Sequence, residues 1–329
     1  MRFGLVLGGG GMLGAAWTVG ALGALERATG RVAGEAEVIL GTSAGALLGS
    51  LLAGGASVAD LADHQLGRPV ATGPLAGIGF DYENAVGGAL PPRPGPAIGS
   101  PGLLRQAVRH PRDYPFLTMV SAAVPTGRGS LVPVGELVRQ LAGSDGWPPG
   151  SPLRVAAVDY RTGRRVVFGD PEAPAAPVAE AVMASCAVPG WFAPVETAGG
   201  RYVDGGCWSA TNADLMLARG LDEVAVLAPM ALRLQPPSGA RGPLDALRAW
   251  RAADRPHGVL AQLVSRYRRA VTRQLMREAR QLREAGIRVR LLAPTPPELA
   301  VMGPNMMDPT RRAAVLHAAR EVQTRMVGR

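Results

Sequence analysis

The sequence predicts a three-layer α/β/α fold around a central, mostly parallel β-sheet. Two kinds of segment alternate along the chain. Short apolar segments of β type lie at 3–7, 38–40, 153–160, 223–228 and 287–293, and segments with helical spacing lie at 15–28, 134–141, 177–187 and 310–327. Strands that alternate with helices favour parallel pairing, because each helix carries the chain back across the sheet. We expect residues 1–329 to form a single α/β domain.

The composition excludes several classes of protein. Hydrophobic residues make up 47% of the chain and charged residues 19%, which is too apolar for a disordered chain. The net charge of +9 favours anionic partners, such as phospholipid headgroups. Nucleic acid is not an expected partner, because the five Phe and five Tyr residues are not interleaved with arginine. Cys186 and Cys207 have no metal-ligand spacing, so we expect no metal.

The N-terminal apolar stretch is interrupted by Gly8 to Gly11, so it predicts a first strand and helix and not a signal peptide. No later segment of 18 or more apolar residues follows. We therefore expect a cytoplasmic protein, which leaves peripheral contact with an anionic membrane open.

A nucleophile elbow is the first motif with chemical content. Gly41-Thr42-Ser43-Ala44-Gly45 follows the apolar run 38–40 and leads into an apolar run at helical spacing, 46–52. Small residues at both glycine positions allow a sharp strand-to-helix turn that exposes a serine hydroxyl. Ser43 is therefore the candidate nucleophile, although a glycine-rich turn without a chemical role would have the same sequence.

A glycine loop after the first strand opens the first helix. Gly9-x-Gly11-x-x-Gly14 satisfies the dinucleotide-binding pattern, and Glu35 and Glu37 lie near the distance of a ribose-binding acid. The same backbone N–H groups could instead form an oxyanion hole. The second interpretation is favoured, because the elbow serine follows the next predicted strand. Both loops would then leave the same edge of a parallel sheet.

A base for the serine is the next requirement. The four histidines lie in helical patterns or beside prolines: His64, His110, His257 and His317. Asp204 ends a short strand and is followed by Gly205 and Gly206, which is where a carboxylate base could reach the serine. An α/β-hydrolase with a histidine triad and a nucleotide-binding protein remain alternative interpretations.

Two segments frame this core. Residues 68–130 are rich in Pro and Gly with one helical piece, 103–108, and predict either a lid or a variable insertion. As a lid, this segment would offer Phe80, Tyr82, Tyr114 and Phe116 as acyl contacts. Residues 235–329 predict a helical C-terminal part that completes the sheet. Its longest helix, 259–285, has an apolar face and an arginine face, which suits either an anionic membrane or solvent.

The motifs together resemble the patatin-like phospholipase family. The resemblance is carried by the glycine loop 9–14, the elbow 41–45 and the Asp-Gly-Gly motif 204–206, in that order, with 184–190 before and 211–214 after the last motif. It is strong over 3–55 and 180–230. One position departs from the family, which often has Arg or Lys where this chain has Leu13.

This resemblance implies a lipid acyl hydrolase with a Ser–Asp dyad and no metal or other cofactor. Ser43 would be the nucleophile and Asp204 the general base. The site residues that the resemblance adds are glycines: Gly9, Gly10 and Gly11 for the oxyanion hole, and Gly14, Gly41, Gly45, Gly205 and Gly206 as supports of the motifs. The implied substrates are phospholipids, lysophospholipids or other long-chain esters.

Overall fold

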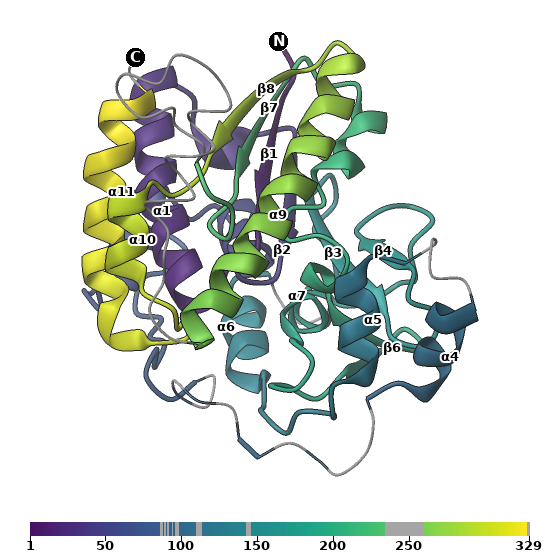
Figure 1. The fold of residues 1–329 in the computed structure, drawn as a ribbon. Coiled ribbons are helices and arrows are strands. Elements are labelled where there is room, and N and C mark those ends of the chain that lie inside the picture. The colour runs from purple at the N-terminus through teal and green to yellow at the C-terminus, as the bar shows by residue number, and fades with distance from the viewer. Residues whose placement is uncertain are drawn as a thin grey trace.

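The central sheet places the predicted site motifs at one edge. The computed structural model describes residues 1–85, 88, 90, 92–93, 95, 99–109, 114–142, 146–233 and 259–327 (Figure 1). Its eight strands follow the order β5-β6-β3-β2-β1-β7-β8, and β4 pairs with β3. The strands are β1 (Phe3–Leu7), β2 (Val38–Thr42), β3 (Leu153–Asp159), β4 (Arg165–Phe168), β5 (Val195–Thr197), β6 (Gly200–Asp204), β7 (Glu223–Leu227) and β8 (Arg288–Leu292).

Helices cover both faces of this sheet. The α-helices in the described residues are α1 (Gly11–Thr29), α2 (Ala44–Ala53), α3 (Val58–Gln65), α4 (Pro101–Arg109), α5 (Phe116–Ala123), α6 (Val132–Ala142), α7 (Val178–Cys186), α9 (Val259–Glu284), α10 (Pro296–Met302) and α11 (Arg312–Val327). The 3₁₀ helices are η1 (Ala33–Glu35), η2 (Gly205–Cys207), η3 (Ala213–Arg219) and η4 (Pro309–Arg311). Figure 1 shows α9 crossing in front of the sheet, whereas α1, α10 and α11 lie together at one side.

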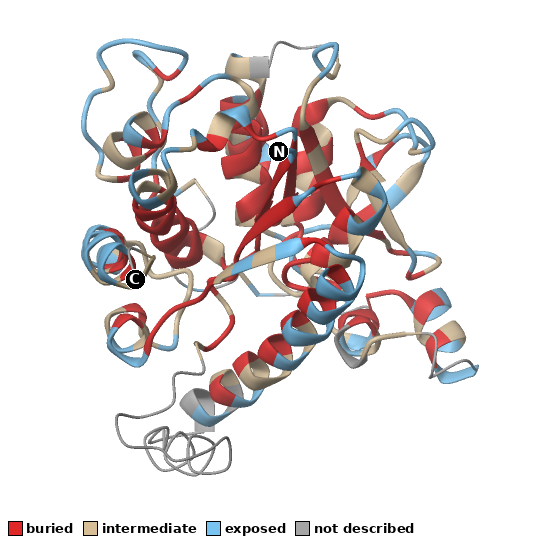
Figure 2. Ribbon diagram, turned by 90° about the horizontal axis from the view of Figure 1, so that it is seen from above, coloured by how far each residue is buried: buried red, intermediate tan, exposed pale blue. Residues whose placement is uncertain are grey.

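Alternate residues of the central strands belong to two separate cores. Leu5 and Leu7 of β1 pack in the core that includes α1, α2 and α7, while Val6 packs in the core that includes α9 and η3. Both cores consist of buried residues, and the central strands between them are mostly red in Figure 2. The period of two along a strand sends neighbouring side chains to opposite faces. The predicted three-layer α/β/α fold is therefore confirmed.

The parallel register explains why two site motifs meet. β1 pairs in parallel with β2 and β7, and Leu7 lies opposite Gly41. The loop after β1 and the turn after β2 consequently leave the sheet at the same level. Parallel strands also include β3 and β8, whereas β4, β5 and β6 pair antiparallel. The sheet is thus mostly parallel, as predicted, with an antiparallel side next to β3.

Three elements differ from the predicted ones. The segment 68–130 contains a second helix, α5, where only one helical piece was predicted, and β5 and α10 were not predicted at all. β5 has three residues, and α10 begins with two prolines, so neither presents a periodic apolar pattern. Of the predicted C-terminal part 235–329, residues 235–258, 328 and 329 lie outside the described residues. β8 from this part extends the sheet beside β7.

One helix cap and one helix crossing show how the sequence sets the outer layer. Ser57 forms a capping box with Asp60 at the start of α3. α1 packs closely against α11, and a Cβ atom added at Gly20 would lie 2.6 Å from the Leu316 carbonyl oxygen. A glycine at this crossing therefore permits a helix separation that alanine does not.

The crossing of α1 and α11 gives a first testable expectation. We expect Gly20→Ala to destabilise the protein by about 1–3 kcal/mol, because the added methyl group overlaps backbone atoms of α11. Gly23→Ala in the same helix meets its nearest atom at 3.4 Å and should stabilise the protein by about 0.5–1 kcal/mol. Urea unfolding of both variants measures the difference. Equal effects at the two positions would show that the crossing is not tightly packed.

Candidate active site

Ser43 sits on a strained turn between β2 and α2. Its backbone has φ 54° and ψ −127°, a region that side-chain-bearing residues rarely occupy, and 8% of the residue is exposed. A Cβ atom added at Gly45 would lie 2.0 Å from the Leu7 carbonyl oxygen, and one added at Gly41 would lie 2.4 Å from the Ala46 Cα atom. Both elbow glycines are therefore required by close backbone packing.

The Ser185 side chain of α7 supports the elbow through hydrogen bonds. The Ser43 N–H donates a hydrogen bond to Ser185 Oγ over 2.9 Å, and the Ser185 hydroxyl donates to the Ala156 carbonyl oxygen over 2.6 Å. Ser185 is fully buried, so water does not compete for these bonds. The motif segment 184–190 thus contributes a support that its sequence alone did not reveal.

Asp204 reaches Ser43 from the antiparallel side of the sheet. Ala156 of β3 pairs with Thr42, and the next residue, Ala157, pairs with Asp204 at the end of β6. Because β6 runs against β3, it returns the chain to the level at which β2 ends. The sequence predicted a strand ending in an acid, but not its direction.

Burial and hydrogen bonds set the acidity of Asp204. Burial raises its pKa to about 6, because removal from water disfavours the charged carboxylate. Hydrogen bonds from the Ser43 side chain and from the Gly206 N–H act in the opposite direction, and the latter spans 2.6 Å. The carboxylate is therefore the predominant form at neutral pH, with a pKa suited to proton exchange near neutrality.

The glycine loop lies against Ser43 at the N-terminus of α1. A Cβ atom added at Gly9 would lie 3.0 Å from the Ser43 Cβ atom. The Gly9 N–H donates to the Ala210 carbonyl oxygen over 2.8 Å, so the predicted role of Gly9 as an oxyanion donor needs correction. In the described chain, the N–H groups of Gly10 and Gly11 form no hydrogen bond. These two donors stand at the positive end of the helix dipole.

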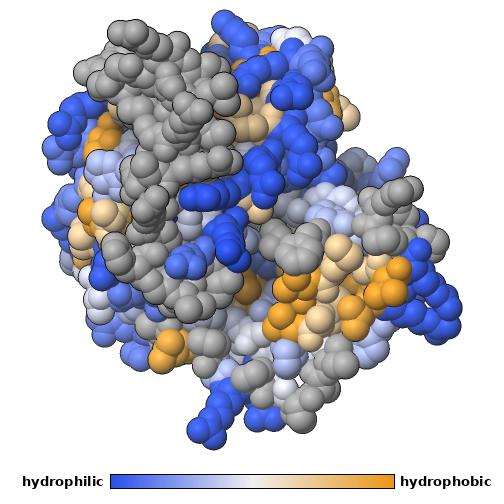
Figure 3. Space-filling model, in the orientation of Figure 1, coloured by the Kyte–Doolittle hydropathy of each residue, from blue (hydrophilic) through white to orange (hydrophobic). Residues whose placement is uncertain are grey.

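An apolar cavity of about 330 Å³ opens above these groups. Its lining comes from seven parts of the chain: the glycine loop, the elbow, α5, the segment after α7, the segment 204–210, the turn after β7 and the C-terminal part. The side chains that give it apolar character are Val120, Val124, Val188, Trp191, Phe192, Met230, Tyr267, Met306 and Met307. Figure 3 shows hydrophobic residues gathered over α5, where Val120 is 40% exposed. The cavity therefore offers an acyl-sized apolar surface next to Ser43.

Comparison with known proteins identifies the family at this point. The sequence matches the family model described as Patatin-like phospholipase over residues 5–71 and 83–217, more than half of the chain. The chain belongs to the patatin-like phospholipase family. Membership of this family assigns the chain to the lipid acyl hydrolases in general. A search among curated proteins gave no match.

Solved structures with a similar arrangement are much longer than this chain. The structure of VipD from Legionella pneumophila is 19% identical, with a TM-score of 0.37 over 77% of this chain and 52% of VipD. The structure of the type III effector protein ExoU is 17% identical, with a TM-score of 0.34 over 99% of this chain and 53% of ExoU. The chain thus spans about half the length of these two proteins.

Three of the four predicted aromatic acyl contacts, Phe80, Tyr82 and Tyr114, do not line the cavity of this patatin-like chain. Tyr82 is buried in the core, where its hydroxyl hydrogen-bonds to His64 Nδ1 over 2.7 Å, and Phe80 packs edge-on against it. The Tyr114 hydroxyl donates to the Thr162 carbonyl oxygen over 2.9 Å. The Phe116 side chain is outside the described set. The segment 68–130 contributes to the cavity through α5 instead.

The histidines and acids of the alternative interpretations lie elsewhere. His64 is buried away from the cavity, and His317 is exposed on α11. The predicted candidates His110 and His257 lie outside the described residues. Glu37, expected near a ribose in a dinucleotide site, accepts a hydrogen bond of 2.7 Å from Arg2 Nε. No described histidine is therefore placed to serve as the base for Ser43.

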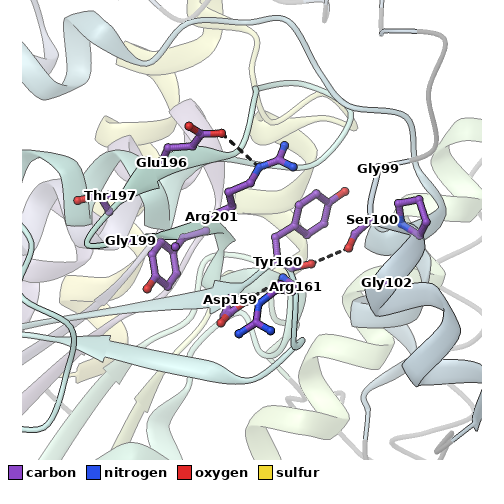
Figure 4. Close-up of a pocket in the computed structure, with 13 residues that line it drawn as sticks. Gly99, Ser100, Gly102, Asp159, Tyr160, Arg161, Glu196, Thr197, Gly199 and Arg201 are labelled. Atoms are coloured by element: carbon purple, nitrogen blue, oxygen red, sulfur yellow. Dashed lines mark hydrogen bonds and ion pairs between the residues drawn. The ribbon is translucent and has the colours of Figure 1, made fainter.

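A second and larger depression, of about 950 Å³, lies between the start of α4 and the β5–β6 hairpin (Figure 4). Polar groups that line this depression form an ion pair and a hydrogen bond with one another. Arg201 Nε lies 3.5 Å from Glu196 Oε1, and the Ser100 hydroxyl donates to the Tyr160 carbonyl oxygen over 2.6 Å. The depression contains neither Ser43 nor Asp204, so size alone does not mark the chemical site.

No group of three or more His, Cys, Asp or Glu residues within the described ranges could hold a metal ion. None of the helices built from those residues combines the length and apolar character that spanning a bilayer requires.

Several lining residues were not predicted from the sequence. Met306 and Met307 belong to the loop 304–309, and Met306 accepts the Leu13 N–H at its carbonyl oxygen over 2.9 Å. Tyr267 and Met230 come from outside the matched region of the family. No local sequence pattern identifies such residues, because only the tertiary structure brings them to the cavity beside the glycine loop.

The strained backbone at Ser43 leads to a stability expectation. We expect Ser43→Gly to be more stable than Ser43→Ala by about 1 kcal/mol, because both lose the hydroxyl but only glycine tolerates φ 54° without cost. Thermal unfolding of the two variants measures this difference. The matched pair at Ser50, inside α2, should show the reverse order, with glycine less stable by about 1 kcal/mol. The same order at both positions would contradict stored strain at Ser43.

Proposed function

We propose that this protein is a serine lipid acyl hydrolase of the phospholipase A, lysophospholipase or esterase type, with Ser43 as nucleophile and Asp204 as general base. One observation carries the proposal. The strained Ser43 hydroxyl bonds to a buried Asp204 carboxylate at the floor of an apolar cavity. Such strain is retained where the surrounding structure holds a reactive group in place.

The first half of the reaction forms an acyl-enzyme. Asp204 accepts the hydroxyl proton while Ser43 Oγ attacks the ester carbonyl carbon. The resulting tetrahedral intermediate collapses, the bond to the alcohol oxygen breaks, and Asp204 returns its proton to the leaving alcohol. In the second half, water gives a proton to Asp204 and attacks the acyl carbon. Ser43 recovers that proton when the fatty acid leaves.

The glycine loop stabilises the charge that develops on the carbonyl oxygen. Gly10 and Gly11 are the donors in this proposal, because the Gly9 N–H is already bound to Ala210. Gly9 then fixes the loop, while the dipole of α1 adds positive potential at the same point. Gly14, Gly205 and Gly206 retain their proposed roles as supports of the motifs.

The substrate side of the proposal rests on the cavity and the outer surface of α9. The apolar lining suits an acyl chain of a phospholipid, lysophospholipid or other long-chain ester. Five exposed arginines lie along α9, namely Arg266, Arg273, Arg277, Arg280 and Arg283. This charge favours peripheral contact with an anionic membrane. The role of residues 68–130 as a lid or a variable insertion, a single-domain organisation and a cytoplasmic location remain predictions.

Substitution of the two reacting groups tests the dyad. We expect Ser43→Ala and Asp204→Asn each to lower kcat on a p-nitrophenyl ester by about a hundredfold or more, because each removes a group that takes part in every turnover. A fluorophosphonate probe should label wild-type protein at Ser43, as mapped by peptide mass spectrometry, and should not label Ser43→Ala.

Two control variants accompany this test. Ser50→Ala removes a hydroxyl that bonds to the Leu47 carbonyl oxygen, and Asp222→Asn alters a carboxylate at the opposite edge of the sheet. Both should retain wild-type turnover. Near-normal activity of Asp204→Asn would exclude the dyad, and loss of activity on replacing His110 or His257 would favour a histidine triad instead.

The pH dependence tests the environment of Asp204. Only the deprotonated carboxylate accepts the Ser43 proton, and burial raises its pKa to about 6. We therefore expect kcat/KM to be flat at neutral pH and to fall tenfold per pH unit below about pH 6. Initial rates between pH 4 and 8 on an ester without a titratable group measure this profile. An acid limb near pH 4, the ordinary range of a solvated Asp, would show that the base is not buried.

A further inference from the structure

Glu278 is a fully buried carboxylate on α9, outside the region matched by the family model. α9 exposes arginines on its outer side, whereas Glu278 points inward and is 0% exposed. A carboxylate so completely removed from water is costly unless hydrogen bonds compensate it. The hydrogen bonds that Glu278 accepts therefore identify the part of the chain that it stabilises.

Glu278 accepts four hydrogen bonds from neutral donors. Oε1 accepts from Ser209 Oγ over 2.6 Å and from Gln274 Nε2 over 2.9 Å. Oε2 accepts from Thr211 Oγ1 over 2.6 Å and from the Ala213 N–H over 2.9 Å. An ionised carboxylate can accept all four, and three of the donors belong to one short segment, residues 209–213, which we call the clamp loop.

The clamp loop touches the backbone on both sides of the proposed dyad. Its Ala210 carbonyl oxygen accepts the Gly9 N–H over 2.8 Å. Asn212 Nδ2 lies 3.1 Å from Thr42 Oγ1 and 3.3 Å from the Gly205 carbonyl oxygen. The loop thus contacts the glycine loop, the residue before Ser43 and the residue after Asp204.

The backbone of the clamp loop needs such support. Asn212 is fully buried and has φ 52°, in the left-handed region that residues other than glycine adopt at some cost. The Asn212 N–H donates to Ser209 Oγ over 3.0 Å, and the Ser209 hydroxyl in turn donates to Glu278. Loss of the carboxylate would leave buried hydroxyl and N–H donors without an acceptor, which favours a rearranged loop.

We infer that Glu278 is a positioning residue for acyl transfer, which holds the clamp loop and, through it, the alignment of the glycine loop with Ser43 and Asp204. The inference rests on the proposed function. Glu278 does not touch the reacting atoms, so its effect is geometric. Displacements of about 1 Å at a reacting centre cost on the order of a hundredfold in rate.

Glu298 provides a matched control. It is likewise a buried carboxylate on a C-terminal helix, and it accepts bonds from Trp17 Nε1 over 2.7 Å, from the Thr295 N–H over 2.7 Å and from Gln323 Nε2 over 3.0 Å. Its partners join α1, α10 and α11, away from the cavity. Loss of Glu298 therefore reports the structural cost of a buried carboxylate network without an effect on the site.

The experiment compares Glu278→Ala, Glu278→Gln and Glu298→Ala. We expect both alanine variants to lower Tm, but only Glu278→Ala to lower kcat, by at least about tenfold with little change in KM. Glu278→Gln should recover most of the kcat, because its amide oxygen can accept from Ala213 while hydroxyls rotate to meet the amide. Assays are performed well below the Tm of each variant. An unchanged kcat for folded Glu278→Ala, or an equal loss in Glu298→Ala, would overturn the inference.

A second readout does not depend on the reaction. Amide hydrogen exchange should accelerate at Gly9, whose N–H bonds to the clamp loop, but not at Gly8, whose N–H bonds to Leu227 in the sheet. If Glu278→Ala does not fold, Thr211→Val removes one donor of the same cluster and should show the same pattern more weakly. Unaltered exchange at Gly9 in either folded variant would overturn the inference.

The activity and exchange measurements distinguish failure of the proposed function from failure of the inference about Glu278. A wild-type protein that neither turns over esters nor reacts with fluorophosphonate would contradict the proposed function, whatever the exchange data show. Normal wild-type activity together with a Glu278→Ala variant that has unchanged kcat and unchanged Gly9 exchange would contradict only the role of Glu278.

Discussion

The contact of Gly45 with the Leu7 carbonyl group is the constraint on which the site depends. β1 and β2 are neighbours in parallel register, and α2 must begin directly against the backbone of β1. This approach leaves no room for a side chain at position 45 and forces the turn at Ser43 into φ 54°. The elbow and the glycine loop are thereby brought to the same edge of the sheet. Strain at one residue is stabilised by packing of the whole central sheet.

The antiparallel side of the sheet supplies the second half of the site. In a fully parallel sheet, the strand next to β3 would end at the same edge of the sheet as β3. Its last residues would then lead into a loop beyond that edge. β6 instead begins beside the carboxyl end of β3, runs antiparallel to it, and ends next to the level at which Thr42 and Ala156 pair. Asp204 is therefore buried beside the sheet and not exposed on a loop. Burial raises its pKa to about 6, so the same topology that places the carboxylate also adjusts its basicity.

The C-terminal elements complete a cavity that the matched region leaves unfinished. Met306 and Met307 cover the glycine loop, Tyr267 of α9 lines the wall, and Glu278 bonds to the clamp loop. Each of these contacts joins segments more than 60 residues apart, as the separations of Glu278 from Ser209 and Thr211 illustrate. The family motifs provide the proposed reacting groups. The remainder of the chain determines how the motifs are supported and which apolar surface a substrate meets.

The local sequence determined the elements and motifs of this protein. Alternating apolar segments predicted the α/β/α fold, and small residues at positions 41 and 45 predicted the turn at Ser43, because these features depend on neighbours in the chain. Only the tertiary structure decided the direction of β6, the loss of the Gly9 N–H to Ala210 and the burial of Tyr82. The same holds for the clamp loop and Glu278. These features depend on contacts between distant segments, whose partners no local pattern specifies.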